Sequence, residues 1–307
     1  MHTSTPVIFD RQALRQHQNR AARSLDHFSF LFEEVGNRLI ERLDDVTRAF
    51  PTVVDLGSHG GMLSQPLSRR AGTQQVFSTD AAKGMLERGR HQQARILGCD
   101  EEALPFADSS LDLVVSSLSL HWVNDLPGTL VQIRRALKPD GLFLAALFGG
   151  HTLHELRQCL LEAESEVEGG ASPRISPFVD IRDMGMLMQR AGFALPVIDC
   201  DTIPVTYDSA LKLMKDLQGM GESNILTERH QTFSRRETLL RAAERYERMF
   251  ANTTTGRLTA TFQIVWVSGW APATTQPKAL RPGTATRSLA EALGATVCGL
   301  DDTTGKG

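Results

Sequence analysis

Residues 53–61 read Val53-Val54-Asp55-Leu56-Gly57-Ser58-His59-Gly60-Gly61, so an apolar run passes directly into a glycine-rich turn. The apolar run predicts a buried strand, and the amphipathic residues 62–70 after the turn predict a helix. Glycine lets the backbone approach a ligand closely, and the first turn of a helix offers unpaired N–H groups. A plain tight turn has the same local sequence, so a binding role depends on what surrounds it.

The surrounding chain alternates short β-rich runs with amphipathic stretches as far as residue 148. The expected strands are 52–56, 75–80, 95–99, 111–118 and 142–148, and the expected helices are 62–70, 81–90 and 126–137, the last stopped by a turn at Pro139-Asp140-Gly141. Parallel strands need such crossovers, and nearly continuous apolar runs fit strands that are buried on both faces. The pattern therefore predicts an α/β fold with a mostly parallel sheet covered by helices.

Beyond residue 148 the alternation loosens. Helices are expected at 151–168, 181–191, 208–217 and 235–250, and strands at 197–205 and 260–266. We expect a helical extension at 1–50 and one main domain at 51–270. Within it, 51–150 forms the core, 151–255 is inserted on the substrate side, and the last strand lies at about 258–268. Residues 271–307 are rich in Pro, Thr, Gly and Ala and are expected to form a flexible tail.

Acidic residues follow the second and third predicted strands. Asp80 ends the second strand, where a carboxylate is placed to accept both hydroxyls of a ribose. Asp100 and Glu101 follow the third strand, where an adenine amino group would donate to them. Singly, Asp80 also suits a helix N-cap, and Asp100 suits a solvated loop. Because the carboxyl ends of parallel strands meet at one edge, the combination predicts a nucleoside site.

The composition argues against several classes of binding partner and cellular location. The 307 residues carry 33 Lys and Arg against 36 Asp and Glu, a formal charge of −3, which argues against a nucleic-acid binder or a polybasic membrane-surface protein. The four cysteines are scattered without metal-ligand spacing, which favours a reducing compartment. No apolar run approaches the roughly 18–20 residues of a membrane-spanning helix, and residues 1–10 lack the apolar segment of a secretory signal.

The dinucleotide pattern G-x-G-x-x-G and the P-loop are both absent. Residues 55–61 instead resemble the D-x-G-x-G-x-G motif of class I S-adenosylmethionine (SAM)-dependent methyltransferases, and 104–106, 111–114 and 137–141 resemble that superfamily's later motifs. The resemblance implies a Rossmann-like fold with a seven-stranded, mostly parallel sheet and SAM as cofactor. The implied contacts are Asp55, Gly57, Ser58, Gly61, Asp80, Asp100, Glu101 and Ser116. His59 departs from the motif, because an imidazole must fit where the middle glycine brings backbone against the ligand.

Longer motifs resemble one family, the mitochondrial complex I assembly factor 5 proteins and their bacterial relatives. The resemblance covers residues 8–270 and rests on Ile8-Phe9-Asp10-Arg11, VVSSLSLHWVNDLP at 114–127, ISPF at 175–178 and DLQGMGESN at 216–224. It implies a protein arginine hydroxylase whose target is the iron–sulfur subunit of NADH:ubiquinone oxidoreductase. The implied location is the bacterial cytoplasm or the periphery of the inner membrane, or the mitochondrial matrix in a eukaryote.

Two rival functions remain open. The first is an ordinary SAM-dependent methyltransferase, such as a malonyl-carrier-protein O-methyltransferase, whose nucleotide motifs look similar. The second is a non-catalytic assembly chaperone that uses SAM structurally.

Four residues are candidates for catalysis or substrate binding. His121 and Trp122 follow the fourth strand, where a base or a stacking indole would meet the substrate, although a buried Trp with a supporting His fits equally well. Tyr207 and Glu222 are candidates for holding a guanidinium. Glu222 belongs to a glycine-rich segment, 219–224, which predicts either a substrate-gripping loop or a helix C-cap.

Two polar clusters have simpler interpretations. His151, His154 and Glu155 have the spacing of a facial iron triad, but a polar helix face explains them better, and no metal is predicted. The acidic residues of the expected helix 151–168 are interpreted as a solvated face, with steering of a basic partner as the alternative; they are Glu162, Glu164, Glu166 and Glu168.

Overall fold

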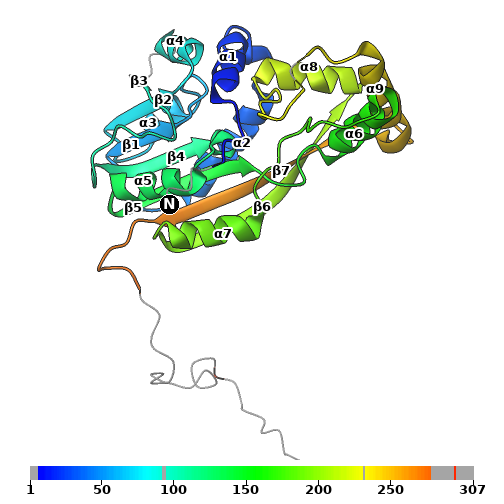
Figure 1. Cartoon of the computed structure of the whole chain (residues 1–307). Helices are drawn as coiled ribbons and strands as arrows, with labels where there is room; N and C mark the ends of the chain where they lie inside the picture. Colours follow the sequence, from blue (N-terminus) through cyan, green and yellow to red (C-terminus); the bar gives the residue numbers. More distant parts are fainter. Residues whose placement is uncertain (1–5, 92–94, 231, 278–293, 295–307) are drawn as a thin grey trace, which may run out of the picture. The chain divides into compact units, whose positions relative to one another are not determined.

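Seven strands form one sheet in the order β3-β2-β1-β4-β5-β7-β6 (Figure 1). The computed structural model describes residues 6–91, 95–230, 232–277 and 294. The strands are β1 (Thr52–Leu56), β2 (Gln75–Asp80), β3 (Arg95–Gly98), β4 (Leu111–Ser117), β5 (Leu137–Phe148), β6 (Ala194–Tyr207) and β7 (Leu258–Trp270). Strands β1 to β5 pair in parallel, whereas β7 runs antiparallel to both β5 and β6. The predicted class I methyltransferase fold is confirmed.

Helices connect the strands and add a helical part beside the sheet. They are α1 (Arg11–Ala21), α2 (Phe30–Asp44), α3 (Ser64–Arg69), α4 (Lys83–His91), α5 (Leu126–Ala136), α6 (His154–Glu168), α7 (Ile181–Arg190), α8 (Ala210–Met220) and α9 (Arg236–Phe250). Short 3-10 turns lie at Leu25–His27 and Leu120–Trp122. Side-chain oxygens that accept from first-turn N–H groups begin four of the helices: Asp10, Asp125, Asp180 and Ser209.

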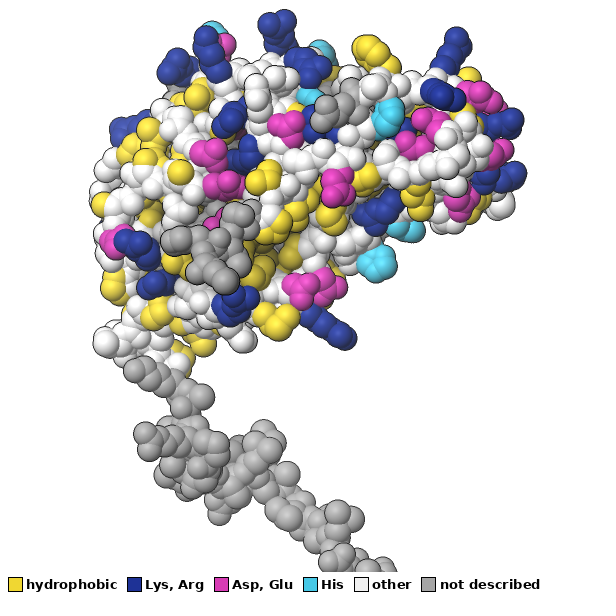
Figure 2. Space-filling view, viewed as in Figure 1, with side chains coloured by type: hydrophobic (Ala, Val, Ile, Leu, Met, Phe, Trp, Pro, Cys, Tyr) yellow, Lys and Arg dark blue, Asp and Glu magenta, His cyan; other side chains and the backbone are white. Residues whose placement is uncertain are grey.

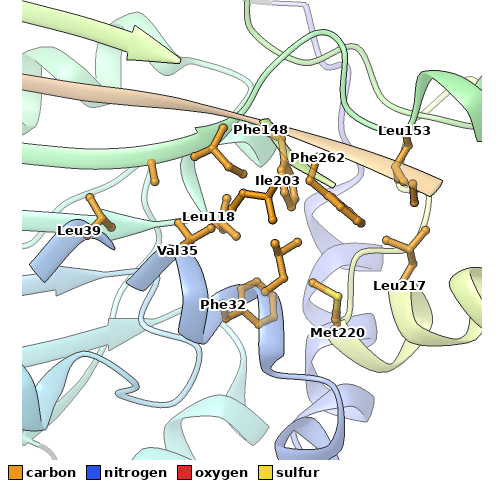
Figure 3. Packing of buried hydrophobic residues seen from close by; sticks show 14 of the residues in the cluster. Phe32, Val35, Leu39, Leu118, Phe148, Leu153, Ile203, Leu217, Met220 and Phe262 are labelled. Carbon is orange, nitrogen blue, oxygen red and sulfur yellow. The ribbon is translucent and has the colours of Figure 1, made fainter. Parts of the chain in front are cut away.

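Neighbouring residues of a strand point to opposite faces of the sheet, and helices cover both faces here. Val53 and Val115 belong to the cluster that includes α2, whereas Val54 and Val114 belong to the cluster beneath α5 and α7. Figure 3 shows the first cluster, in which Phe32 of α2 lies between the sheet and Met220 of α8. The helical part beside the sheet therefore shares a core with it.

Several element boundaries differ from the sequence prediction. Pro139-Asp140-Gly141 is not a free turn after the helix but part of β5, where the register against β4 shifts. The glycine turn continues to residue 63, so α3 begins at Ser64 and is only six residues long. Gly219 does not break its helix: α8 runs to Met220, and Gly221, at φ +85°, is the C-cap. The predicted tail from residue 278 lies outside the described residues, Gly294 excepted.

The acidic run of α6 is not the free solvated face that we expected. Glu162 and Glu166 both pair with Arg245 of α9, and the buried Glu164 pairs with Arg174. Glu168 accepts a hydrogen bond from Thr238. These carboxylates connect α6 with α9 and with the segment before α7, while the Glu162 and Glu166 side chains remain 38% and 49% exposed.

Helix α2 supplies a test of the packing. Leu39 is fully buried where α2 covers the sheet. Leu39→Ala should lower the free energy of unfolding by about 2–5 kcal/mol, because it leaves a cavity in close-packed surroundings. Leu161→Ala is the matched control, since Leu161 is 49% exposed on α6, and chemical denaturation measures both variants. Equal destabilisation of the two would contradict the packing described.

Candidate functional site

The candidate site lies at the carboxyl ends of the central strands. The strand order reverses at β1, which has β2 on one side and β4 on the other, so the loops that follow these strands converge. Gly57 has φ +69°, and an added Cβ would overlap the Ser119 hydroxyl after β4. The turn is closed by Ser58, whose N–H donates to the Thr79 carbonyl and whose Oγ accepts from the Gly61 N–H. Glycine at 57 is therefore required by both backbone and space.

Two buried carboxyl groups, Asp55 and Asp80, end β1 and β2. Burial raises the pKa of Asp55 to about 7 and that of Asp80 to about 8; for Asp80 the charges of Glu101 and Asp55 add to this effect. Asp80 accepts a hydrogen bond from the Ala82 N–H at 2.9 Å, as the N-cap interpretation predicted. Neither oxygen of Asp55 has a hydrogen-bond partner of normal geometry among the described residues, although the Leu63 N–H partly offsets the rise of its pKa.

Arg11 of α1 covers the acids that follow β3. Its guanidinium pairs with Asp100 at 2.7 Å and with Glu101, and it donates to the Trp122 carbonyl at 3.3 Å. Glu101 also accepts from the Ser119 hydroxyl at 3.0 Å. Burial opposes the charge on Arg11, but the two carboxylates outweigh burial and raise its pKa. Asp100 and Glu101 are therefore held by α1 rather than left as solvated loop acids.

His59, the departure from the glycine motif, turns into the protein. Its ring stacks on Phe32 of α2 with a centroid separation of 4.1 Å, and Nε2 lies 3.0 and 3.1 Å from the carbonyls of Ser117 and Leu118. These acceptors imply that Nε2 carries the proton, and burial lowers the pKa of the ring. The imidazole thus braces α2 against the end of β4. Ser116 donates from the same strand end to the Leu56 carbonyl.

Three of the four catalytic candidates come together around one carboxylate. Trp122 donates from Nε1 to Glu222 Oε2 at 3.0 Å, and His121 Nε2 lies 3.3 Å from the same oxygen. The Glu222 side chain is only 5% exposed, and that of His121 only 1%. Both contacts use Oε2, and Oε1 accepts no hydrogen bond from any residue that the structure describes. An anion is therefore held in a largely apolar setting with one oxygen unused.

A cavity of about 190 Å³ lies beside Glu222. Apolar and aromatic side chains make up most of its wall, and Trp122, Phe148 and Phe178 pack against one another there. Arg174 also lines it, but its guanidinium is paired with Glu164 at 2.7 Å and donates to Ser234 at 2.6 Å. A long cationic side chain with an apolar stem fits a cavity of this kind.

The remaining candidates lie elsewhere. Tyr207 is buried at the end of β6, its hydroxyl makes no hydrogen bond to any described residue, and burial together with Asp216 raises its pKa. It does not line the Glu222 cavity. Glu155 accepts from Thr261 of β7, and its Oε2 also lies 3.3 Å from Nδ1 of His154, whose ring centroid is 6.3 Å from that of His151. Among the described residues, no group of three or more His, Cys, Asp or Glu is arranged to hold a metal ion.

Sequence reasoning assigned no role in the site to Arg11, Phe148 or Phe178. Arg11 and Phe178 belong to the family motifs at 8–11 and 175–178, which supported the family resemblance but did not indicate what either side chain contacts. Their roles depend on the folded chain. Helix α1 brings Arg11 to Asp100, which follows β3, and the loop before α7 brings Phe178 to Phe148 at the end of β5. None of the helices in the described part of the chain is long and apolar enough to cross a membrane.

Comparison with known proteins bears on the family and the fold. Residues 54–145 match a family described as a methyltransferase domain. The human mitochondrial "Arginine-hydroxylase NDUFAF5" is 45% identical over 288 residues, covering 92% of this chain and 83% of the relative. A "Malonyl-[acyl-carrier protein] O-methyltransferase" of a Methylovorus species is 34% identical over 281 residues, covering 88% and 92%. The YcgJ protein of Bacillus subtilis shares the fold, with a TM-score of 0.53 at 14% identity over 77% of this chain and 99% of that chain.

Asp55 generates a prediction about the pH dependence of stability. Its folded pKa of about 7 lies above the ordinary value of 3.8, so the folded protein holds the proton more tightly than the unfolded chain. The free energy of unfolding therefore falls as pH rises from about 4 to about 7. Relative to Asp55→Asn, the wild type should lose roughly 2–3 kcal/mol between pH 5 and pH 8.

Denaturant titrations at the two pH values measure this difference. Asp108→Asn serves as the control, because the Asp108 side chain is 63% exposed. A difference between wild type and Asp55→Asn that does not change with pH would contradict the assignment.

Proposed function

The chain belongs to the family of the arginine-hydroxylases named NDUFAF5, and on this premise we propose that it binds SAM and modifies an arginine of a protein. It is an enzyme of the SAM-dependent methyltransferase superfamily. The proposal has two parts, a cofactor crevice at the glycine turn and an arginine pocket at Glu222.

The residues of the crevice fit SAM. The unpartnered carboxylate of Asp55 suits a cationic or hydroxyl donor, and Asp80 keeps acceptor capacity beyond its one bond to Ala82. Gly57 presents bare backbone where a side chain would not fit. The residues proposed to hold the cofactor are Asp55, Gly57, Ser58, Gly61, Asp80, Asp100, Glu101 and Ser116. When bound, SAM supplies an electrophilic methyl group on a sulfonium.

Glu222 is the observation that carries the arginine part of the proposal. A guanidinium is a planar cation that donates several hydrogen bonds to a carboxylate and stacks on aromatic rings. Glu222 offers Oε1, and Trp122 and Phe178 offer rings in the same cavity. The methylenes of an arginine would pass along Leu156, Met214 and Leu217. A buried anion in an apolar cavity favours a cation and disfavours a carboxylate substrate such as a malonyl group.

Each residue has a distinct task in this scheme. Glu222 orients the guanidinium, and His121 and Trp122 hold the carboxylate in place from the other side. The aromatic wall excludes water and so strengthens the ion pair. Tyr207 has no task here, because its hydroxyl makes no bond to Glu222.

We propose hydroxylation of the arginine as the outcome, and the iron–sulfur subunit of respiratory complex I as the protein that carries it. Hydroxylation is an oxidation, so the proposal includes molecular oxygen and an external two-electron reductant: one oxygen atom replaces a hydrogen of the arginine as a hydroxyl, and the other leaves as water. The name shared by relatives at 42–45% identity supports hydroxylation, and the long sequence motifs support the substrate. Methylation is the alternative, since relatives at 34% identity are named O-methyltransferases. Methyl transfer from the sulfonium needs little catalysis beyond the proximity and orientation of the two reactants. The third possibility is a chaperone that holds the subunit without modifying it.

Cofactor binding is tested by titrating the protein with SAM in a calorimeter. At pH 9, above the Asp80 pKa of about 8, Asp80→Asn keeps the shape of the side chain but removes the charged acceptor, and should weaken binding by about 1.5–3 kcal/mol. Asp108→Asn, at an exposed site, should leave the affinity unchanged. If the wild type does not bind SAM at all, the cofactor part of the proposal fails.

The outcome is tested by mass spectrometry of the complex I iron–sulfur subunit from wild-type cells, from cells that lack this protein, and from deletion cells that carry a variant. In wild-type cells an arginine of the subunit should be heavier by 16 Da, whereas an increase of 14 Da would indicate methylation. Glu222→Gln should abolish the modification, because a neutral amide does not balance a buried guanidinium. Glu228→Gln, at an exposed position in the same loop, should restore it fully. An unmodified arginine in wild-type cells would overturn both enzyme readings for this substrate.

A further inference from the structure

A second cavity, of about 300 Å³, lies between α1 and α8. Three of the residues that line it are basic or imidazole side chains, namely His17, Arg20 and Lys215. Hydroxyl and amide groups complete its polar wall: Ser24, Gln218 and Ser223. Neither Asp nor Glu lines this cavity. The cavity is therefore cationic, although the chain as a whole carries a charge of −3.

The basic groups of this cavity are not neutralised within the described part of the chain. Arg20 donates only to the Gln16 carbonyl, and neither Arg20 nor Lys215 forms an ion pair with a described residue. His17 Nδ1 is buried without a hydrogen-bond partner. Burial and then the charges of Arg20 and Arg229 lower the pKa of His17, and the charges of Asp10 and Glu222 oppose them in part. Figure 2 shows Lys and Arg side chains gathered over the region of α1, α4 and α8.

This cationic cavity adjoins the Glu222 cavity. Gln218 and Ser223 line both, so the end of α8 and the loop after it form a shared wall. That wall is firmly placed, because a Cβ at Gly219 would overlap the Phe28 ring and Gly221 requires its positive φ. An anion-lined and a cation-lined cavity thus lie side by side on one fixed element. Such an arrangement is complementary to a ligand that carries both charges.

We propose that the cavity between α1 and α8 binds a carboxylate of the polypeptide segment that presents the arginine, so that the enzyme selects an arginine with an acidic neighbour. The inference rests on the proposed function, because it takes Glu222 as the arginine site. A residue of extended chain spans about 3.3–3.6 Å, so an acid within a few positions of the arginine reaches an adjoining cavity. The chain's net negative charge disfavours a nucleic acid as the source of the anion.

The test uses the full chain with SAM and four fluorescent peptides measured by anisotropy. Each peptide is twelve residues long and has a varied residue at its centre. A glutamate or a glutamine stands two to four residues away from that central residue. The central residue is arginine in one pair and citrulline in the other, which removes the positive charge while keeping the shape. The glutamate peptide with arginine should bind about tenfold more tightly than its glutamine counterpart, as a charge-assisted contact gives.

Protein variants assign that preference to the cavity. The double variant Arg20→Gln with Lys215→Gln should bind the glutamate and glutamine peptides equally. Lys212→Gln removes the same charge elsewhere on α8, where the ammonium pairs with Asp208, and should keep the tenfold preference. Competition by N-acetylglutamate but not by inorganic phosphate would identify a carboxylate site.

Each outcome separates the two claims. Equal binding of glutamate and glutamine peptides to the wild type overturns the carboxylate site, whatever the arginine pair shows. A preference that survives in the double variant, or that is lost equally in Lys212→Gln, overturns it as well. Citrulline peptides that bind as tightly as the arginine peptides, with a glutamate preference that still depends on Arg20 and Lys215, would uphold the carboxylate site and contradict arginine binding at Glu222.

Discussion

The reversal of strand order at β1 is the constraint on which the rest of this structure depends. With β2 on one side of β1 and β4 on the other, the loops after three strands open onto the same space. After β5 the chain leaves the sheet, returns as the edge strand β6, and finally inserts the antiparallel β7 between β5 and β6. Helices α6, α8 and α9 lie in the connections between these strands. Residues of α6 and α8 line the Glu222 cavity together with Trp122, which follows β4, and Phe148, which ends β5.

Buried polar groups without partners concentrate near these strand ends. The carboxylate of Asp55, His121 Nδ1 and the hydroxyl of Ser117 each lack a hydrogen-bond partner among the described residues. Leaving such groups unpaired costs about 1–3 kcal/mol each. These unpaired groups lower the free energy of unfolding, and burial of apolar side chains in the two clusters that flank the sheet offsets this loss. A ligand that satisfies these groups would therefore stabilise the protein as it binds.

The sheet was predictable from sequence because its strands are buried on both faces and read as apolar runs; the bounds of β1 and β2 were predicted without error. The start of β5 was not, because Pro139 and Gly141 are turn residues that the register shift against β4 accommodates. The charge pairs were beyond sequence reasoning. Arg11 reaches Asp100 across 89 positions, and Trp122 reaches Glu222 across 100. Their residue types made Trp122 and Glu222 separate candidates in the sequence, but only the folded chain brings the loop after α8 to the turn after β4 and joins them.

The central claim is that the residues at the glycine turn hold the cofactor and that Glu222 presents an arginine to it. A crystal structure of the full chain with S-adenosylhomocysteine and an arginine peptide tests it most directly. The account predicts the ribose against Asp80 and the guanidinium against Oε1 of Glu222, with Oε2 still bound by His121 and Trp122. A peptide bound outside the Glu222 cavity, or an adenosine away from Asp80, would contradict it.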